Sequence, residues 1–151
     1  MSATTKFDEF VIAQDAVYDA VLRELTAGRK RTHWMWFIFP QLLGLGASWM
    51  SQRFGLASQA EACNYLQHAI LGPRLIECTQ LMLAVENRDI LSILGEPDDR
   101  KFRSSMTLFA IAAPELEWFD EALHKYFAGE RDALTLALLR NKSDANREST
   151  R

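Results

Sequence analysis

The residues best suited to chemistry in this 151-residue chain begin at His33, which is followed closely by Trp34 and Trp36. An imidazole can act as a general acid or base, and indole rings offer a surface on which a flat ligand can stack. The pattern therefore indicates His33 as a catalytic residue and both tryptophans as ligand-binding residues. The alternative is a core anchor, in which His33 caps the carbonyls of a helix that ends near Gly28.

A second group of polar side chains lies further along the chain, where Lys101, Arg103 and Ser105 could bind a phosphate or carboxylate. At about 100° per residue these side chains point to different sides of a helix, and Ser105 falls on the apolar side with Phe102. A buried serine can instead donate to the carbonyl four residues earlier. Helix packing therefore remains the alternative to ligand binding.

A third group surrounds a turn, where Arg74 follows Gly72 and Pro73. Free amides at the start of the next helix could receive an anion beside Arg74, although a simple turn would need only the glycine and the proline. With Gln41 at the end of the aromatic segment, the predicted ligand-binding set is complete: Trp34, Trp36, Gln41, Arg74, Lys101, Arg103 and Ser105.

Standard catalytic motifs are missing from the sequence, including phosphate loops, nucleophile elbows and His-Glu-x-x-His patterns. The adjacent acidic and basic residues at 98–101 resemble a nuclease signature, but they fit the first turn of a helix better. Cys63 and Cys78 have no partner at metal-ligand spacing and are predicted to be structural thiols. We therefore predict no metal site and no cofactor.

The composition predicts one globular domain, because 48% of the residues are hydrophobic. A net charge of −3 argues against nucleic acid as a partner. The sequence shows neither a signal peptide nor about 18 consecutive apolar residues, so we expect a cytoplasmic protein without membrane contact.

Helical periodicity dominates the chain, with prolines and capping residues at the expected starts and glycines at several expected ends. The predicted helices cover residues 7–25, 58–68, 71–85, 89–94, 97–113, 114–127 and 133–139, the last capped by Asp132. Residues 33–40 are uniformly bulky, and periodicity does not separate a strand from a buried helix there. Since no convincing partner strand exists, a buried helical or irregular segment is favoured.

The predicted fold is therefore all-α, a single compact domain of about six or seven helices around the buried aromatic segment. The domain covers residues 1–140. Residues 141–151 have no apolar side chain larger than alanine and are predicted to form a disordered tail.

Three segments resemble a known family, namely residues 28–41, 65–75 and 97–109. In this order they are similar to the bacterial "domain of unknown function eighteen-ten" family, over about residues 7–139. The resemblance implies a mainly helical fold and no established activity. The family is sometimes labelled calpastatin, but that inhibitor is a disordered repeat protein, whereas this chain has a core-forming composition.

The leading functional hypothesis is a pocket for a small anionic, ring-bearing ligand, with charge neutralised by Arg74, Lys101 and Arg103. A hydrolase acting on a nucleotide derivative is compatible with this pocket, although no nucleophile is identifiable. The alternative is an interaction module that binds a protein partner or a second copy through exposed aromatic surface. A pocket predicts that the three segments converge on one cleft, and the module predicts a flat aromatic patch.

Overall fold

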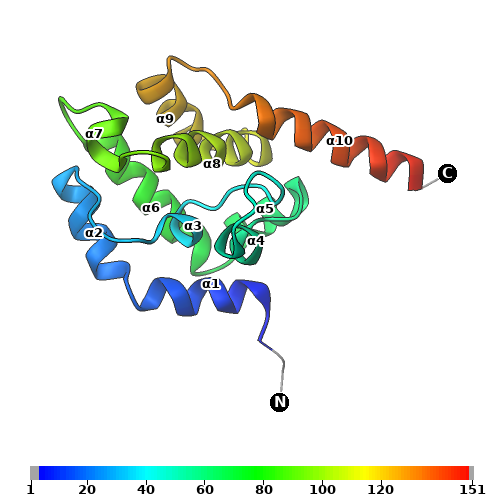
Figure 1. Ribbon diagram of the computed structural model, residues 1–151, viewed down its shortest axis with the longest axis horizontal. Helices are drawn as coiled ribbons and strands as arrows, with labels where there is room; N and C mark the ends of the chain where they lie inside the picture. The colour runs from blue at the N-terminus through cyan, green and yellow to red at the C-terminus, as the bar shows by residue number, and fades with distance from the viewer. Residues whose placement is uncertain (1–3, 150–151) are drawn as a thin grey trace.

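The structure is a computed structural model that describes residues 4–149 of the chain (Figure 1). Over this range it consists of ten helices and no strands, with one isolated parallel bridge between Leu42 and Leu56. The helices are α1 (Lys6–Asp15), α2 (Tyr18–Ala27), α3 (Met35–Ile38), α4 (Trp49–Phe54), α5 (Gln59–Gln67), α6 (Leu71–Ala84), α7 (Ile90–Leu94), α8 (Asp98–Ala112), α9 (Trp118–Phe127) and α10 (Ala133–Ser149).

The all-α prediction is confirmed, but the predicted number of six or seven helices was too low for two reasons. The segment at 7–25 forms two helices, because the chain breaks at Val17, whose φ is −131° and ψ is −2°. In addition, α3 and α4 are too short to carry a helical period of their own. The break lets α1 and α2 bury different side chains, Phe10 from the first and Val21 from the second.

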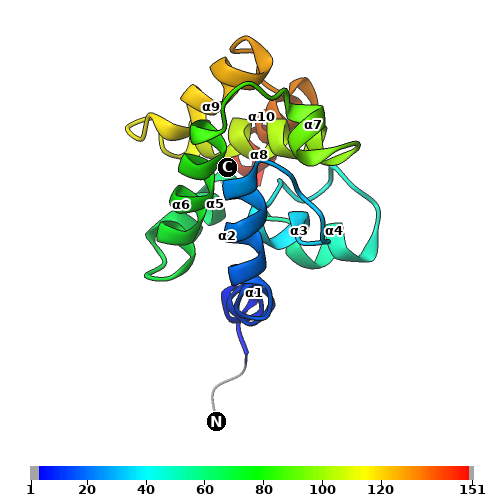
Figure 2. The same ribbon diagram turned by 90° about the vertical axis from the view of Figure 1, so that its left-hand side faces the viewer.

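The body of the molecule is built around α8, which packs against α5, α9, α7 and α10. Its buried residues include Phe102, Met106 and Phe109, each fully enclosed. Figure 1 shows α8 crossing the centre, with α9 above it. Seen from the left-hand side, α2 stands in front of this body, with α3 and α4 on one side and α5 and α6 on the other (Figure 2).

The aromatic segment is a short helix with irregular flanks, as the sequence analysis favoured. Met35, Phe37, Ile38 and Phe39 are all buried around α3. The segment is not uniformly enclosed, however, because His33 is exposed and Trp36 is half-buried. The segment therefore contributes side chains both to the core and to the surface of the molecule.

Helix caps follow the sequence well. The Ser58 hydroxyl accepts from the Glu61 amide at 3.1 Å, and an Asp132 carboxylate oxygen accepts from the Thr135 amide at 3.0 Å. The predicted cap at Asp132 is thus confirmed, and Ser58 caps α5, while the Glu61 carboxylate accepts from the Ala57 amide at 3.1 Å. Pro114 does not open a helix directly, because α9 begins only at Trp118.

The last helix is longer than its apolar pattern suggested. We predicted a disordered tail at 141–151, and the structure instead continues α10 through Ser149, while residues 150–151 lie outside the described range. Lys142, Ala145, Arg147 and Glu148 in this segment have high helix propensity, which favours continuation of the helix beyond its last large apolar residue, Leu139. In Figure 1 this end of α10 projects away from the body. Among the helices of residues 4–149, none combines the length and apolar character needed to cross a lipid bilayer.

Candidate functional site

The loop after α2 positions the candidate site, and its backbone is fixed at both ends. Gly28 has a φ of +72°, a left-handed conformation that ends α2, and its amide donates to the carbonyls of Glu24 and Leu25. The next amide, of Arg29, donates to the Glu24 carbonyl at 2.9 Å. The Lys30 amide then donates to the Ile93 carbonyl at 2.7 Å, which attaches the loop to α7. Backbone groups, rather than His33, thus cap α2.

The carboxylate of Glu24 holds the rest of this loop. It accepts hydrogen bonds from the Arg31 amide at 2.6 Å, the Thr32 amide at 2.9 Å and the Thr32 hydroxyl at 2.7 Å. A fourth bond comes from the Trp34 indole Nε1 at 3.0 Å. Burial by itself would raise the pKa of Glu24, but these hydrogen bonds outweigh burial and lower it to about 2. Glu24 is therefore an ionised internal anchor.

Trp34 is part of the core, in contrast to its predicted ligand-binding position. The whole side chain is enclosed, with 0% of its surface exposed. Its ring lies 6.2 Å from that of Phe39, and the Lys30 ammonium lies 5.0 Å from its centroid. No face of Trp34 is open to a stacking ligand, so the structure places it as a support for the loop.

Trp36 and His33 do reach a common surface cleft. This cleft has a volume of about 350 Å³, and its charged, aromatic and imidazole lining is Lys30, Arg31, His33, Trp36, Glu96, Asp98 and Lys101. We call it the Lys101 cleft. The loop after α2 and the first turn of α8 form its two sides, so the 28–41 and 97–109 segments converge there.

The charges of the Lys101 cleft are unequally neutralised. Asp98 binds Lys30 closely, with 2.9 Å between the ammonium nitrogen and a carboxylate oxygen. The same carboxylate is 3.7 Å from the Lys101 ammonium, which is beyond hydrogen-bonding distance. Lys101 instead lies over the Trp36 ring, 4.7 Å from its centroid. A cation and an aromatic face are thus presented together.

Gln41 lies next to this cleft, in a smaller hollow of about 260 Å³ that shares Lys101 and Pro97 with it. The Gln41 carbonyl accepts from the Leu56 amide at 2.9 Å, so its backbone is held by the bridge between residues 42 and 56. The side chain is half-buried at the cleft border. Four predicted residues therefore gather in one region: His33, Trp36, Gln41 and Lys101.

Arg74 is not brought to this region. One of its terminal nitrogens donates to the Gln14 side chain at 3.2 Å, and the other donates to Asp15 at 2.8 Å. Its guanidinium also lies 4.7 Å from the centroid of the Tyr18 ring. Arg74 thus joins α6 to α1 and α2. The third resembling segment therefore lies apart from the cleft.

The amides at the start of α6 are satisfied internally. His68 Nδ1 accepts from the Ile70 amide at 3.1 Å and from the Leu71 amide at 3.2 Å. The anion that we considered for this turn is therefore replaced by an imidazole from the chain itself.

Arg103 and Ser105 are also separate from the cleft. The Arg103 guanidinium donates to the Glu130 carbonyl at 3.0 Å and pairs with the Glu130 carboxylate at 3.2 Å. Ser105 is completely enclosed, and its hydroxyl is one of two buried side-chain oxygens without a partner among the described residues. Helical angles had already assigned these residues to different sides of α8, and the structure agrees with that geometry.

Both cysteines have structural surroundings. Burial raises the pKa of the Cys78 thiol to about 12, which keeps it protonated and unreactive at neutral pH. The Cys63 thiol donates to the Ala112 carbonyl at 3.1 Å. Neither thiol lines the Lys101 cleft.

Comparison with known protein families identifies one family whose sequence pattern this chain matches. Residues 4–139 match the family described as "Protein of unknown function (DUF1810)". The chain belongs to the DUF1810 family. This range agrees with the three resembling segments of the sequence. A search of curated proteins found no match.

A solved structure similar to this DUF1810 chain is the crystal structure of the conserved hypothetical protein Rv1873 from Mycobacterium tuberculosis, determined at 1.38 Å. The two are 55% identical, with a TM-score of 0.86, and the match covers 87% of this chain and 94% of the other. The fold described here is therefore shared by a relative with an experimentally determined structure.

Two residues of the candidate site were not predicted from sequence. Lys30 was given no role in the site from sequence, and residues 98–101, which include Asp98, were interpreted only as suited to the first turn of a helix. The available signal was their position inside two of the resembling segments, 28–41 and 97–109. Their contact across 68 positions of sequence could not be inferred from local spacing.

Proposed function

We propose that this DUF1810 protein binds a small anionic ligand that carries a flat ring, such as a nucleotide, in the Lys101 cleft. The observation that carries the proposal is the Lys101 ammonium 4.7 Å from the Trp36 ring centroid, without a hydrogen bond to Asp98. A ring packed against the accessible part of this indole would bring its anionic group close to Lys101. Arg31 adds positive charge to the same cleft, in which Lys30 is already paired with Asp98.

His33 provides the chemistry that a ligand in this cleft would meet. Its imidazole is exposed at the lining, where it can exchange a proton with a bound molecule. The described lining includes no serine, threonine or cysteine, so a hydrolytic reaction there would use water activated by His33. We propose ligand binding as the primary function, hydrolysis of a nucleotide derivative as its extension, and the cytoplasm as its location.

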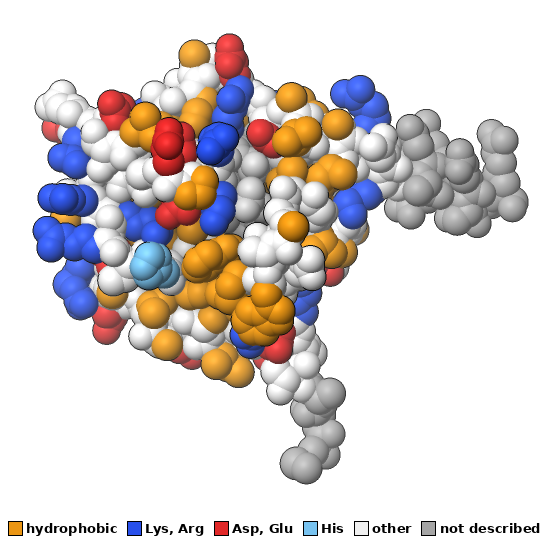
Figure 3. Space-filling model, viewed as in Figure 1, with side chains coloured by type: hydrophobic (Ala, Val, Ile, Leu, Met, Phe, Trp, Pro, Cys, Tyr) orange, Lys and Arg blue, Asp and Glu red, His pale blue; other side chains and the backbone are white. Residues whose placement is uncertain are grey.

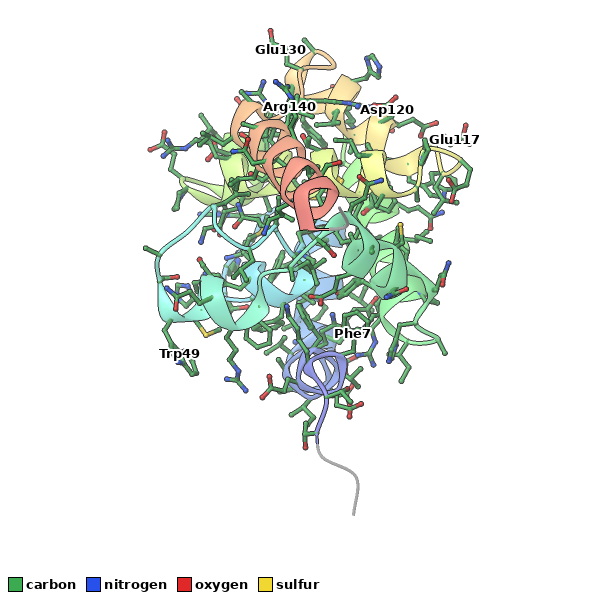
Figure 4. All side chains as sticks on the ribbon, turned by 90° about the vertical axis from the view of Figure 1, so that its right-hand side faces the viewer. Phe7, Trp49, Glu117, Asp120, Glu130 and Arg140 are labelled. Carbon is green, nitrogen blue, oxygen red and sulfur yellow. The ribbon has the colours of Figure 1, made fainter. Side chains whose placement is uncertain are left out.

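A specific observation favours a second candidate, a protein-interaction module. Trp49 on α4 is 68% exposed, and Figure 4 shows it at the outer edge of the molecule. Its ring packs against the guanidinium of Arg53, 5.1 Å from the ring centroid. A large exposed tryptophan is typical of contact surfaces between proteins. This candidate predicts concentration-dependent association that Trp49→Ala abolishes.

Thermal unfolding of the full chain with AMP, adenosine, ribose 5-phosphate and inorganic phosphate tests the first proposal. We expect AMP to raise the melting temperature most, by about 4 °C at ten times its Kd. Lys101→Gln and Trp36→Leu should each remove most of this shift. Arg140→Gln on α10 (Figure 4), an exposed residue that lines neither the Lys101 cleft nor the hollow that holds Gln41, is the matched control and should keep it.

The result that would overturn ligand binding is equally concrete. If none of the four probes shifts the melting temperature at millimolar concentration, the Lys101 cleft is not a site for this class. If AMP shifts the wild type, Lys101→Gln and Trp36→Leu equally, the ligand binds elsewhere. Size-exclusion chromatography of the wild type and Trp49→Ala, run in parallel over a range of concentrations, tests the interaction candidate independently of both outcomes. Association that is present in the wild type and absent in Trp49→Ala would support it.

A further inference from the structure

A second cleft adjoins the proposed site and is lined by three arginines. Its volume is about 370 Å³, and its lining includes Arg23, Glu24, Arg29, Arg31 and Thr32. We call it the arginine cleft. Arg31 also lines the Lys101 cleft, so the two hollows meet at this side chain. Figure 3 shows the corresponding concentration of basic side chains along the left-hand edge, over α2 and the loop that follows it.

The three arginines of this cleft line one hollow together without a carboxylate partner, whereas Arg88, Arg100 and Arg140, which are also unpaired in the described part of the chain, do not line it. Within the described residues, the arginines that pair with carboxylates are Arg53, Arg74, Arg103 and Arg131. Arg23, Arg29 and Arg31 form no such pair, and all three are exposed. Their guanidinium groups therefore retain their donors for a molecule from outside.

One carboxylate, Glu24, faces the arginine cleft, and it is already engaged. Its oxygens accept the four hydrogen bonds from the loop and from Trp34. Because Glu24 holds the loop that carries Arg29 and Arg31, it fixes their backbone while leaving their guanidinium groups unpaired. The result is a group of positive charges with a fixed backbone on a chain whose net charge is −3.

Gathering like charges is unfavourable unless an anion shares them, and guanidinium groups bind phosphate with paired hydrogen bonds. A ligand that lies against Trp36 and continues past Arg31 would carry its ring at one end and further negative charge at the other. Its two halves would fill adjoining hollows of about 350 Å³ and 370 Å³.

Resting on the proposed function, we propose that the ligand is a nucleoside with a chain of two or more phosphates. The ring and first phosphate occupy the Lys101 cleft, and the distal phosphates occupy the arginine cleft. Arg31 lies between the two. The number of phosphates, and not the identity of the base, then dominates affinity.

Isothermal titration of the full chain with AMP, ADP, ATP and inorganic tripolyphosphate tests this arrangement. We expect ATP to bind at least about tenfold more tightly than AMP. A double variant, Arg23→Gln with Arg29→Gln, should reduce ATP affinity to that of AMP while leaving AMP affinity unchanged. Arg31 is left intact because it touches both clefts, and Arg140→Gln is the control for loss of one distant positive charge.

The outcomes separate this inference from the proposed function. Equal affinities for AMP and ATP, or a double variant that weakens both nucleotides equally, would overturn the phosphate-chain inference and leave AMP binding standing. Tripolyphosphate that binds as tightly as ATP, without dependence on Trp36→Leu, would also overturn it, because the ring would then contribute nothing. No binding by any nucleotide would remove the proposed function itself. A melting temperature for each variant confirms that these exposed substitutions leave the fold intact.

Discussion

The Glu24 carboxylate and the Trp34 indole are joined by a 3.0 Å hydrogen bond inside the molecule. This bond connects the second turn of α2 to the residue immediately before α3. His33 and Trp36 flank the connection and face the Lys101 cleft. The candidate site therefore depends on a buried charge that does not itself line that cleft.

Replacing Glu24 with glutamine should destabilise the protein. A carboxamide keeps one acceptor oxygen but turns its amino group toward donors in the loop, so at least one of the Thr32 or Trp34 hydrogen bonds is lost. We expect the free energy of unfolding to fall by about 2 to 3 kcal/mol. Denaturant unfolding at pH 7 measures this loss. Asp19→Asn, at an exposed position of the same helix, should change stability by less than about 0.5 kcal/mol.

The contribution of Glu24 should also depend on pH in a defined direction. Its pKa falls from the ordinary 4.5 to about 2 in the folded state, so the unfolded chain takes up the proton first as acid is added. The stabilisation is complete above pH 4.5 and is lost as the pH falls toward 2. It amounts to about 3 kcal/mol.

Unfolding measured from pH 6 to pH 2.5 tests this dependence. The stability difference between wild type and Glu24→Gln should shrink steadily below pH 4.5. A difference that stays constant across that range would show that the hydrogen bonds do not lower the pKa of Glu24 in the folded state.

Ser105 and Thr107 offer a contrast between two buried hydroxyls on α8. The Thr107 hydroxyl donates to the Arg103 carbonyl at 2.8 Å and accepts from the Asp132 amide at 2.9 Å, whereas that of Ser105 has no partner in the described structure. Thr107→Val should therefore cost about 1 to 2 kcal/mol, because it leaves the Asp132 amide unpaired. Ser105→Ala should be neutral or stabilising by up to about 1 kcal/mol. Chemical denaturation of both variants decides the matter, and a large loss for Ser105→Ala would point to a partner for its hydroxyl.

The fold was largely predictable because helix signals are local. Ser58 and Asp132 are recognisable caps, and the apolar stripe from Leu75 to Met82 requires no knowledge of the tertiary structure. The break at Val17 was not predictable in this way, since the helical period continues across it. Gln14, just before the break, donates to the Phe37 carbonyl at 2.8 Å, a contact between distant segments.

The candidate site was only partly predictable, for a related reason. Residue type indicated that Trp34 and Trp36 could both stack on a ligand, but the Glu24 contact holds Trp34 fully buried, whereas Trp36 is half-buried. Likewise, Arg74 and Lys101 have equal charge, and each lies in one of the three segments that resemble the family. Which of them is engaged by Gln14 and Asp15, and which is open to a cleft, is decided by packing between helices far apart in sequence.

Arg74 should consequently affect stability and leave ligand binding unchanged. Arg74→Gln removes a donor from the enclosed Gln14 side chain, 3.2 Å away, and breaks the 2.8 Å pair with Asp15. We expect a loss of about 1 to 2 kcal/mol in the free energy of unfolding. Arg53→Gln, which breaks a longer pair with Glu9 at 3.8 Å and whose arginine is more exposed than Arg74, should cost less than about 1 kcal/mol.

The upward shift in melting temperature with AMP distinguishes a cation that stabilises the fold from one that binds the ligand. In Arg74→Gln it should equal that of the wild type, although both melting curves begin at a lower temperature. In Lys101→Gln the starting temperature should be nearly unchanged, because its 3.7 Å contact with Asp98 contributes little, and the AMP shift should be lost. A variant Arg74→Gln that keeps its stability but loses the AMP shift would place the anion at the start of α6, between Arg74 and the amides that His68 now occupies.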